Sequence, residues 1–243
     1  MRSLLSPRRP LPGGGSSFRW TGGSTKDGRW QWCRVYHRDS FSPHGQFPRT
    51  WGPLSRFDTH RAAADGSAKD DPERSVLYIG EDLATSACEV FGPVEEAAIC
   101  PNYRVALLRP TRALTMFDLI EPGSAMAIGA LPALADGPFD RALTQEWARA
   151  IDEDQPLGVP TDGILYRSGY NGGRSLAVWS AEGKVDVLGQ PESDLPLDHP
   201  GLLAKLKVDL QLRHIVIRTI TEADCVQCRQ QTERIKRSAG RPQ

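Results

Sequence analysis

Residues 77–91 read LYIGEDLATSACEVF, and this stretch indicates the fold class because it joins a strand directly to a helix. The apolar and aromatic residues at its start predict a strand over residues 75–79. Asp82 is a favourable N-cap residue, and the apolar residues after it recur at helical spacing. We therefore expect a helix from Asp82 to about Phe91, ended by the Gly-Pro pair that follows.

Patterns on both sides of this stretch predict further elements. Apolar and β-branched runs predict strands at residues 32–36, 103–109, 163–168, 175–179, 185–188 and 214–221. Apolar residues at a four-residue spacing predict a helix over about residues 138–152, and another is expected near residues 202–212. The strands are short and do not alternate strictly with helices, which favours an α+β fold over a doubly wound sheet. We expect a compact mixed sheet core with flanking helices.

The two ends of the chain differ in composition from the middle. Residues 1–28 are rich in Gly, Pro, Ser and Arg, and such a segment has too few apolar side chains to order itself. We expect this segment to be a flexible tail. Residues 222–243 are strongly charged and predict a helical tail. Between the two tails, residues 29–221 are expected to form one domain.

Composition argues against several classes of protein, although a local basic patch could still bind a polyanion. Thirty basic and thirty acidic residues cancel, so no overall positive charge favours direct nucleic-acid binding. No apolar run approaches the roughly 18–20 residues that a membrane span needs. The N-terminus has arginines without an apolar stretch behind them, which makes it a poor secretory signal. Five scattered cysteines do not suggest a disulfide framework, so we expect a cytoplasmic protein.

The common motifs for phosphate, dinucleotide and metal binding are not found in the sequence. Cys225 and Cys228 have the spacing of half a zinc site, but no second half lies near them in the sequence. His37, His44 and His60 are scattered over a loop-rich region, where histidines are usually surface or loop residues. We therefore expect no metal site.

Four stretches in a fixed order resemble the RES-domain family, which is named after an arginine, a glutamate and a serine. Besides residues 77–91, they are WCRVY at 32–36, LSRFD at 54–58, and DGILYRS at 162–168, followed by Asn171-Gly172-Gly173. The resemblance implies an NAD-binding fold similar to that of ADP-ribosyltransferases. It places five residues in the family's pocket, namely Arg34, Arg56, Tyr78, Glu89 and Ser168.

The implied chemistry suits these residue types. Cleavage of the nicotinamide–ribose bond passes through an oxocarbenium-like transition state, which the carboxylate of Glu89 could stabilise. Nicotinamide leaves as a neutral ring, so a second carboxyl group is not required as an acid. Arg34 and Arg56 could bind the pyrophosphate through bidentate hydrogen bonds, with Arg34 and Ser168 assisting at the catalytic centre.

Two further positions could contact the dinucleotide. Tyr78 offers a flat face for nicotinamide or adenine, and Ser168 could hold the carboxamide or orient an arginine. The turn at Asn171 would let the backbone approach a bound ligand closely.

Three functions remain open at this point. The first is an NAD-degrading toxin of a toxin–antitoxin pair, in which water or phosphate receives the ADP-ribosyl group. The second is a protein-modifying ADP-ribosyltransferase that uses the same pocket, and the third is a nucleotide-binding module without activity. Glu89 counts against the third, because a decayed site would be free to lose its carboxylate. The resemblance also implies an antitoxin partner with a helix-turn-helix domain.

Overall fold

The computed structural model describes residues 4–26, 29–39, 42–94, 96–137, 140–181 and 187–239. Its strands are β1 (Ser16–Trp20), β2 (Ser24–Lys26), β3 (Arg29–His37), β4 (Trp51–Gly52), β5 (Lys69–Asp70), β6 (Arg74–Asp82), β7 (Glu96–Ile99), β8 (Tyr103–Leu107), β9 (Leu114–Asp118), β10 (Gly163–Arg167), β11 (Arg174–Ala181), β12 (Ser193–Pro196) and β13 (Val216–Thr219). The helices are α1 (Leu83–Phe91), α2 (Ser124–Ala127), α3 (Arg141–Asp154), α4 (Pro200–Gln211) and α5 (Val226–Ala239), with short 3₁₀ turns η1 (Gly92–Val94) and η2 (Pro132–Ala135).

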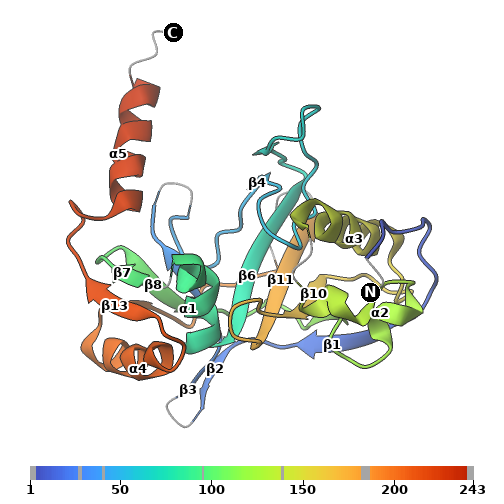
Figure 1. The fold of residues 1–243 in the computed structure, drawn as a ribbon, viewed down its shortest axis with the longest axis horizontal. Coiled ribbons are helices and arrows are strands. Elements are labelled where there is room, and N and C mark those ends of the chain that lie inside the picture. The colour runs from blue at the N-terminus through green and yellow to red at the C-terminus, as the bar shows by residue number, and fades with distance from the viewer. Residues whose placement is uncertain are drawn as a thin grey trace.

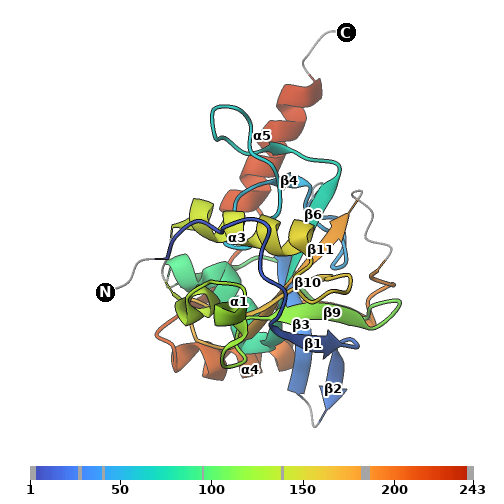
Figure 2. The same ribbon diagram turned by 90° about the vertical axis from the view of Figure 1, so that its right-hand side faces the viewer.

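One large mixed sheet organises the described part of the chain, as Figures 1 and 2 show. Its strand order is β1-β9-β10-β11-β6-β3-β8-β12, and β2 pairs with β3 beside this path. The pairing of β10 with β9 is parallel, whereas β11 pairs antiparallel with both β10 and β6. Helices pack against the sheet, so the expected α+β architecture with a mixed sheet core and flanking helices is confirmed.

The strand-to-helix junction at Asp82 forms as the sequence predicts. The Asp82 carboxylate accepts a 2.7 Å hydrogen bond from the backbone N–H of Thr85, which caps α1. Gly80 lets the helix approach β6, because a Cβ atom at this position would lie 2.5 Å from the backbone nitrogen of Ser86. The Ser86 hydroxyl in turn accepts a 2.6 Å hydrogen bond from the backbone N–H of Val35. Helix α1 is therefore fixed to both β6 and β3.

Successive side chains of β6 point to opposite faces of the sheet and pack in two different clusters. Val76 and Tyr78 pack in the same cluster as Trp147 of α3. Leu77 and Ile79 belong to a different cluster, made mainly of residues from the strands. Helices α1 and α4 complete a third cluster around β3 and β8, which includes Val35 but not its neighbour Arg34.

The N-terminal segment differs from the flexible tail that composition predicts. Strand β1 pairs antiparallel with β9 at the edge of the large sheet. Leu4, Leu11 and Trp20 are buried, with exposed fractions of 6%, 7% and 1%. A strand paired with a distant segment gains its hydrogen bonds and burial from that partner, and local composition does not show this gain. Residues 1–3, 27 and 28 lie outside the described residues.

Most other expected elements are present with shifted ends. The expected helix at 138–152 is α3, and its first two residues, 138 and 139, lie outside the described residues. The expected strand at 214–221 is the shorter β13, which pairs with β7 in a separate small sheet. Of the expected strand at 185–188, Leu188 forms a single bridge to Pro110, and residues 185 and 186 are not described.

The helical tail expected over residues 222–243 is α5, which projects away from the rest of the molecule in both views. No helix among the described residues is long and apolar enough to cross a membrane.

Candidate functional site

One face of α1 carries Glu89 and packs against the loop that follows β10. Thr85, Glu89 and Gly92 are spaced four and three residues apart, so they share this face. The Asn171 side-chain amide donates a 3.2 Å hydrogen bond to the Thr85 hydroxyl. A Cβ atom at Gly92 would lie 2.5 Å from the ring of Tyr170. The loop from residue 168 to 173 therefore lies along the helix on both sides of Glu89.

The carboxylate of Glu89 is buried and only partly satisfied. Its Oε1 atom has no hydrogen-bond partner among the described residues. Burial raises the pKa of Glu89 above its ordinary value, whereas a hydrogen bond with Ser168 and the positive charge of Arg56 act in the opposite direction. Ser168 is itself 2% exposed. The structure thus brings together the glutamate, the serine and the second arginine that the sequence singled out.

Arg56 is held by backbone carbonyls and aromatic rings. Its guanidinium donates to the carbonyl oxygens of Arg167 and Leu134 over 3.3 and 3.2 Å. It also lies 5.0 Å from the ring centre of Phe57 and 5.7 Å from that of Tyr166. The Nε atom of Arg56 is buried without a partner in the described part of the structure. Arg56 therefore keeps a donor free beside Glu89.

Asp58 is close to Arg56 in the sequence and could have formed an ion pair with it, but its carboxylate binds other residues. It is completely buried and forms an ion pair with Arg49 at 2.8 Å. The Tyr78 hydroxyl donates to the same carboxylate over 2.7 Å and accepts from the backbone N–H of Phe57 over 3.2 Å. The hydroxyl of Tyr78 thus holds the loop that carries Arg56, while its ring lies edge-on to Tyr166 with centres 6.4 Å apart.

Arg34 is not part of this cluster. Its guanidinium donates to the carbonyl oxygens of Gly45 and Phe47 over 2.8 and 2.7 Å, and to the Ser42 hydroxyl over 3.1 Å. Burial lowers the pKa of Arg34 to about 10. Because Cys33 and Val35 point toward α1, alternation directs Arg34 to the opposite side of β3. Within the described ranges it contacts neither Glu89 nor Ser168.

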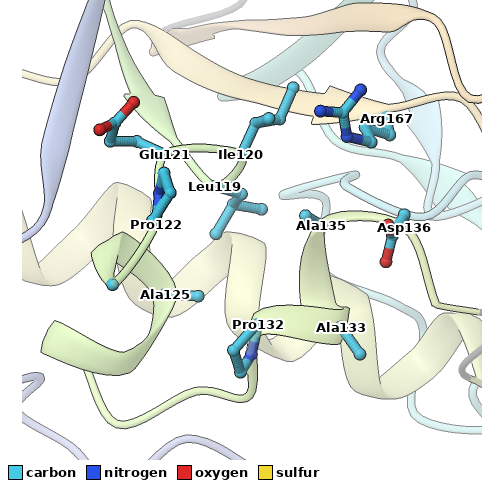
Figure 3. Close-up of a pocket in the computed structure, with 11 residues that line it drawn as sticks. Leu119, Ile120, Glu121, Pro122, Ala125, Pro132, Ala133, Ala135, Asp136 and Arg167 are labelled. Atoms are coloured by element: carbon cyan, nitrogen blue, oxygen red, sulfur yellow. The ribbon is translucent and has the colours of Figure 1, made fainter.

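A cavity of about 350 Å³ lies beside the cluster. It lies between the loop after β9, helix α2 and the turn η2, and Arg167 forms part of its wall. In Figure 3 the guanidinium of Arg167 and the carboxylate of Glu121 stand at opposite ends of the upper part of the view. Arg56 binds the carbonyls of Arg167 and Leu134, so it joins the two segments that border this cavity. Glu89, Arg56 and Ser168 are not among the described residues that line the cavity, so only Arg167 connects it to the cluster.

Tyr166 and Thr85 belong to the site although the sequence analysis did not select them. Tyr166 faces Arg56, and its hydroxyl pKa lies well above the ordinary value, with burial as the main cause and the charge of Glu89 adding to it. The signal for Tyr166 was its position two residues before Ser168 in the strand predicted over residues 163–168, because alternation along a strand places both on one face. The signal for Thr85 was its position one turn before Glu89.

The fold is of the α+β class, and its site combines a half-buried glutamate, a serine and an arginine. The model of the RES domain matches residues 19–198 of the chain, so the chain belongs to the RES-domain family. This finding confirms the resemblance noted in the sequence.

Among solved structures, the crystal structure of the M. tuberculosis MbcT–MbcA toxin–antitoxin complex contains a chain similar to this one. The two chains are 20% identical, with a TM-score of 0.47, and the match covers 77% of this chain and 92% of the other. No match was found among curated proteins.

Proposed function

We propose that this chain is an NAD-consuming enzyme that cleaves the nicotinamide–ribose bond, with water or phosphate as the acceptor. The observation that carries this proposal is the buried Oε1 atom of Glu89, which has no partner in the described structure. An unsatisfied buried carboxylate oxygen costs stability and is retained where it interacts with a ligand. Its position on the family's glutamate motif, beside Arg56 and Ser168, supports the same site.

The role of Glu89 follows from the charge that develops in the reaction. As the bond to nicotinamide breaks, positive charge grows on the anomeric carbon and ring oxygen of the ribose. A carboxylate already fixed in a buried site stabilises this charge more in the transition state than in the ground state. The hydrogen bond with Ser168 favours the ionised form that this role requires.

Arg56 is the proposed anchor for the negatively charged part of the dinucleotide. Its guanidinium is oriented by two backbone carbonyls and two rings, and its Nε donor remains free. A planar donor held in this way suits a phosphate oxygen. The hydroxyl of Tyr78 is bound to Asp58, so its proposed contribution to the pocket is the face of its ring. Asn171 and Arg34 are proposed to position loops, because their polar atoms are used within the protein.

The test is the release of free nicotinamide from NAD by the purified full chain. Glu89→Gln should abolish this release, whereas Glu96→Gln is a matched control because Glu96 forms an exposed ion pair with Arg218. Assays with water alone and with added phosphate identify the acceptor. Adenine-labelled NAD that labels a protein band would instead favour the transferase. No release of nicotinamide under any of these conditions would contradict the proposal.

We further propose that the enzyme is a growth-inhibiting toxin that a helix-turn-helix antitoxin neutralises. Membership of the RES-domain family supports this proposal. Expression of the wild-type chain alone should stop cell growth, and expression of the Glu89→Gln variant at the same level should not. Equal growth in both cultures would count against a toxic activity. Purification of the chain with the product of the adjacent gene would test the partner.

A further inference from the structure

Four potential metal ligands meet at one point outside the site described above. The side chains are those of His37, Cys100, Cys225 and Cys228, and their ligand atoms all lie within 4.8 Å of one another. They are buried, with exposed fractions of 8%, 0%, 3% and 9% in the same order. We propose that these four residues bind one Zn²⁺ ion as a structural site.

The distances between the ligand atoms match a tetrahedral zinc site. A zinc ion with bonds of about 2.3 Å to sulfur and about 2.0–2.1 Å to nitrogen places two sulfurs about 3.8 Å apart and a sulfur about 3.6 Å from the nitrogen. The Sγ atoms of Cys100 and Cys228 are 3.7 Å apart. The Nε2 atom of His37 lies 3.3 Å from Cys228, 3.5 Å from Cys100 and 3.8 Å from Cys225. Four of the six distances are thus close to those of a tetrahedral zinc site, and the two sulfur–sulfur distances to Cys225 are within 4.8 Å.

The backbone presents each ligand from a well-defined element. Cys225 and Cys228 flank the start of α5 with the two-residue spacing of a zinc half-site. Cys100 begins a turn closed by a 3.0 Å hydrogen bond from the backbone N–H of Tyr103 to its carbonyl oxygen. His37 is the last residue of β3. The second half of the site, which could not be found near the cysteine pair in the sequence, therefore comes from distant strands.

The surroundings of the cluster also fit a metal. Nε2 of His37 faces the three sulfurs, and Nδ1, which has no hydrogen-bond partner among the described residues, lies 4.0 Å from the carboxylate of Asp39. Metal-binding histidines commonly direct the other ring nitrogen to a carboxylate. The side-chain amide of Asn102 donates to the sulfur of Cys228 over 3.5 Å, as amides do to metal-bound thiolates.

A disulfide explains the cluster less well than a metal. The cysteines are free, and the 3.7 Å between two of the sulfurs is well beyond the roughly 2.05 Å of an S–S bond. A disulfide would also leave a third thiol and the imidazole unexplained. Four protein ligands leave no open position for water or substrate, so the ion is structural rather than catalytic.

The site would attach an extension to the family domain. Cys225 and Cys228 lie beyond residue 198, where the family match ends, whereas His37 and Cys100 lie within the match. The ion would thus fasten the base of α5, the projecting helix in Figure 1, to the end of β3 and the turn after β7. The same strand β3 carries Arg34, so the ion would also steady that end of the strand.

The experiment measures metal in the full chain, purified without chelator from cells grown with zinc. Elemental analysis should find one zinc per chain after gel filtration. Cys228→Ala and Cys225→Ala should each remove most of this zinc. The matched control is Cys88→Ala, because Cys88 is a buried free cysteine outside the cluster. The proposal would be overturned if Cys228→Ala kept its zinc, or if Cys88→Ala were the one variant that lost it.

A second measurement does not depend on the folding of any variant. Zinc is removed from the wild-type chain under reducing conditions, and Co²⁺ is added. The expected spectrum has the ligand-field absorption of tetrahedral cobalt with a sulfur-to-cobalt charge-transfer band, both displaced by added zinc. A folded wild-type chain that contains no zinc and gives no such bands, or that contains a disulfide between these cysteines, would refute the site. Neither measurement depends on NAD, so the result is independent of the proposed enzyme activity.

Discussion

Asn171 donates a 3.2 Å hydrogen bond to the hydroxyl of Thr85, one helical turn before Glu89. This bond joins the loop that carries Ser168 to the helix that carries the glutamate. The same loop returns to the sheet at Gly173, whose missing side chain leaves room for Thr85. The geometry of the Glu89–Ser168 pair therefore depends on contacts made by residues that need not touch the substrate.

Gly173→Ala should separate this loop from α1. The added Cβ atom would lie 2.2 Å from Oγ1 and 2.9 Å from Cγ2 of Thr85, a side chain that is 1% exposed. Overpacking of this kind typically costs about 1–3 kcal/mol in the free energy of unfolding. Thermal or urea unfolding measures the loss, and turnover should fall with it because Ser168 shifts.

Gly169→Ala is the matched control in the same loop. A Cβ atom there would meet only the guanidinium of Arg56, at an ordinary distance of 3.8 Å. Thr85→Ala in the Gly173→Ala background should recover part of the lost stability, because it removes the two clashing atoms. Equal stability of Gly173→Ala and wild type would mean that the loop does not pack on Thr85.

Glu89→Gln should give a folded protein with turnover reduced by about a hundred- to a thousandfold, because one preorganised charge is lost. The raised pKa of Glu89 means that the folded chain binds its proton more tightly than the unfolded chain does. Stability of the wild type therefore falls as the pH rises through the range between the two pKa values. The variant lacks this fall, so the difference between the two melting temperatures should grow in favour of the variant through that range and stay constant above it.

Melting curves and activity must come from the same preparation. Turnover of the wild type should decline on the acid side at a pH above that of an ordinary glutamate, because the ionised form is required. Wild-type turnover in a folded Glu89→Gln protein would falsify the catalytic role. A melting difference that is the same at every pH would show that Glu89 does not titrate with a raised pKa.

Arg56→Lys should raise the Michaelis constant for NAD roughly ten- to hundredfold, the effect of losing a charge-assisted hydrogen bond. Lysine cannot keep the contacts to Arg167 and Leu134 and also present a free donor, because it lacks the planar fork. Arg109→Lys is the control, since Arg109 forms an exposed ion pair with Glu192, and such pairs contribute about 0–1 kcal/mol. Similar Michaelis constants for both variants would exclude Arg56 from the binding site.

Arg34→Lys should lower stability without a selective effect on NAD binding. Arg34 donates to the carbonyls of Gly45 and Phe47; Gly45 is buried, and an unpaired buried carbonyl costs about 1–3 kcal/mol. Unfolding experiments and the Michaelis constant measured together distinguish the two roles. A higher Michaelis constant at unchanged stability would show that Arg34 contacts the dinucleotide directly.

Local signals predicted the centre of the fold. The cap at Asp82, the helix after it and the β10–β11 hairpin all depend on neighbours in the sequence, and all three are found. Strand β1 escaped prediction because its partner β9 lies far along the chain. Its Gly- and Ser-rich composition is typical of a loop, and pairing with a distant strand outweighs that preference.

The sequence predicted which residues form the site, but not how they lie relative to one another. Glu89, Arg56 and Ser168 were found through the family motifs, and the structure brings them together. Arg34 lies apart from these three residues because side chains alternate along β3. Cys33 and Val35 face α1, so Arg34 points to the other side of the strand. The cysteine–histidine cluster could not be predicted, because three distant segments contribute to it and only the Cys225–Cys228 pair has a recognisable spacing.

Helix α4 lies beyond the family match and still belongs to the packed core. Leu202, Leu206 and Leu210 of α4 share a cluster with Val35 of β3 and with α1. A ribosome makes these leucines after residues 19–198, so a nascent chain that has just completed the family domain still exposes the apolar surface that they cover. This cluster can close only after α4 has been made. Until then the growing chain is a target for chaperones, and the proposed catalytic residue Glu89 sits on a helix that α4 does not yet cover.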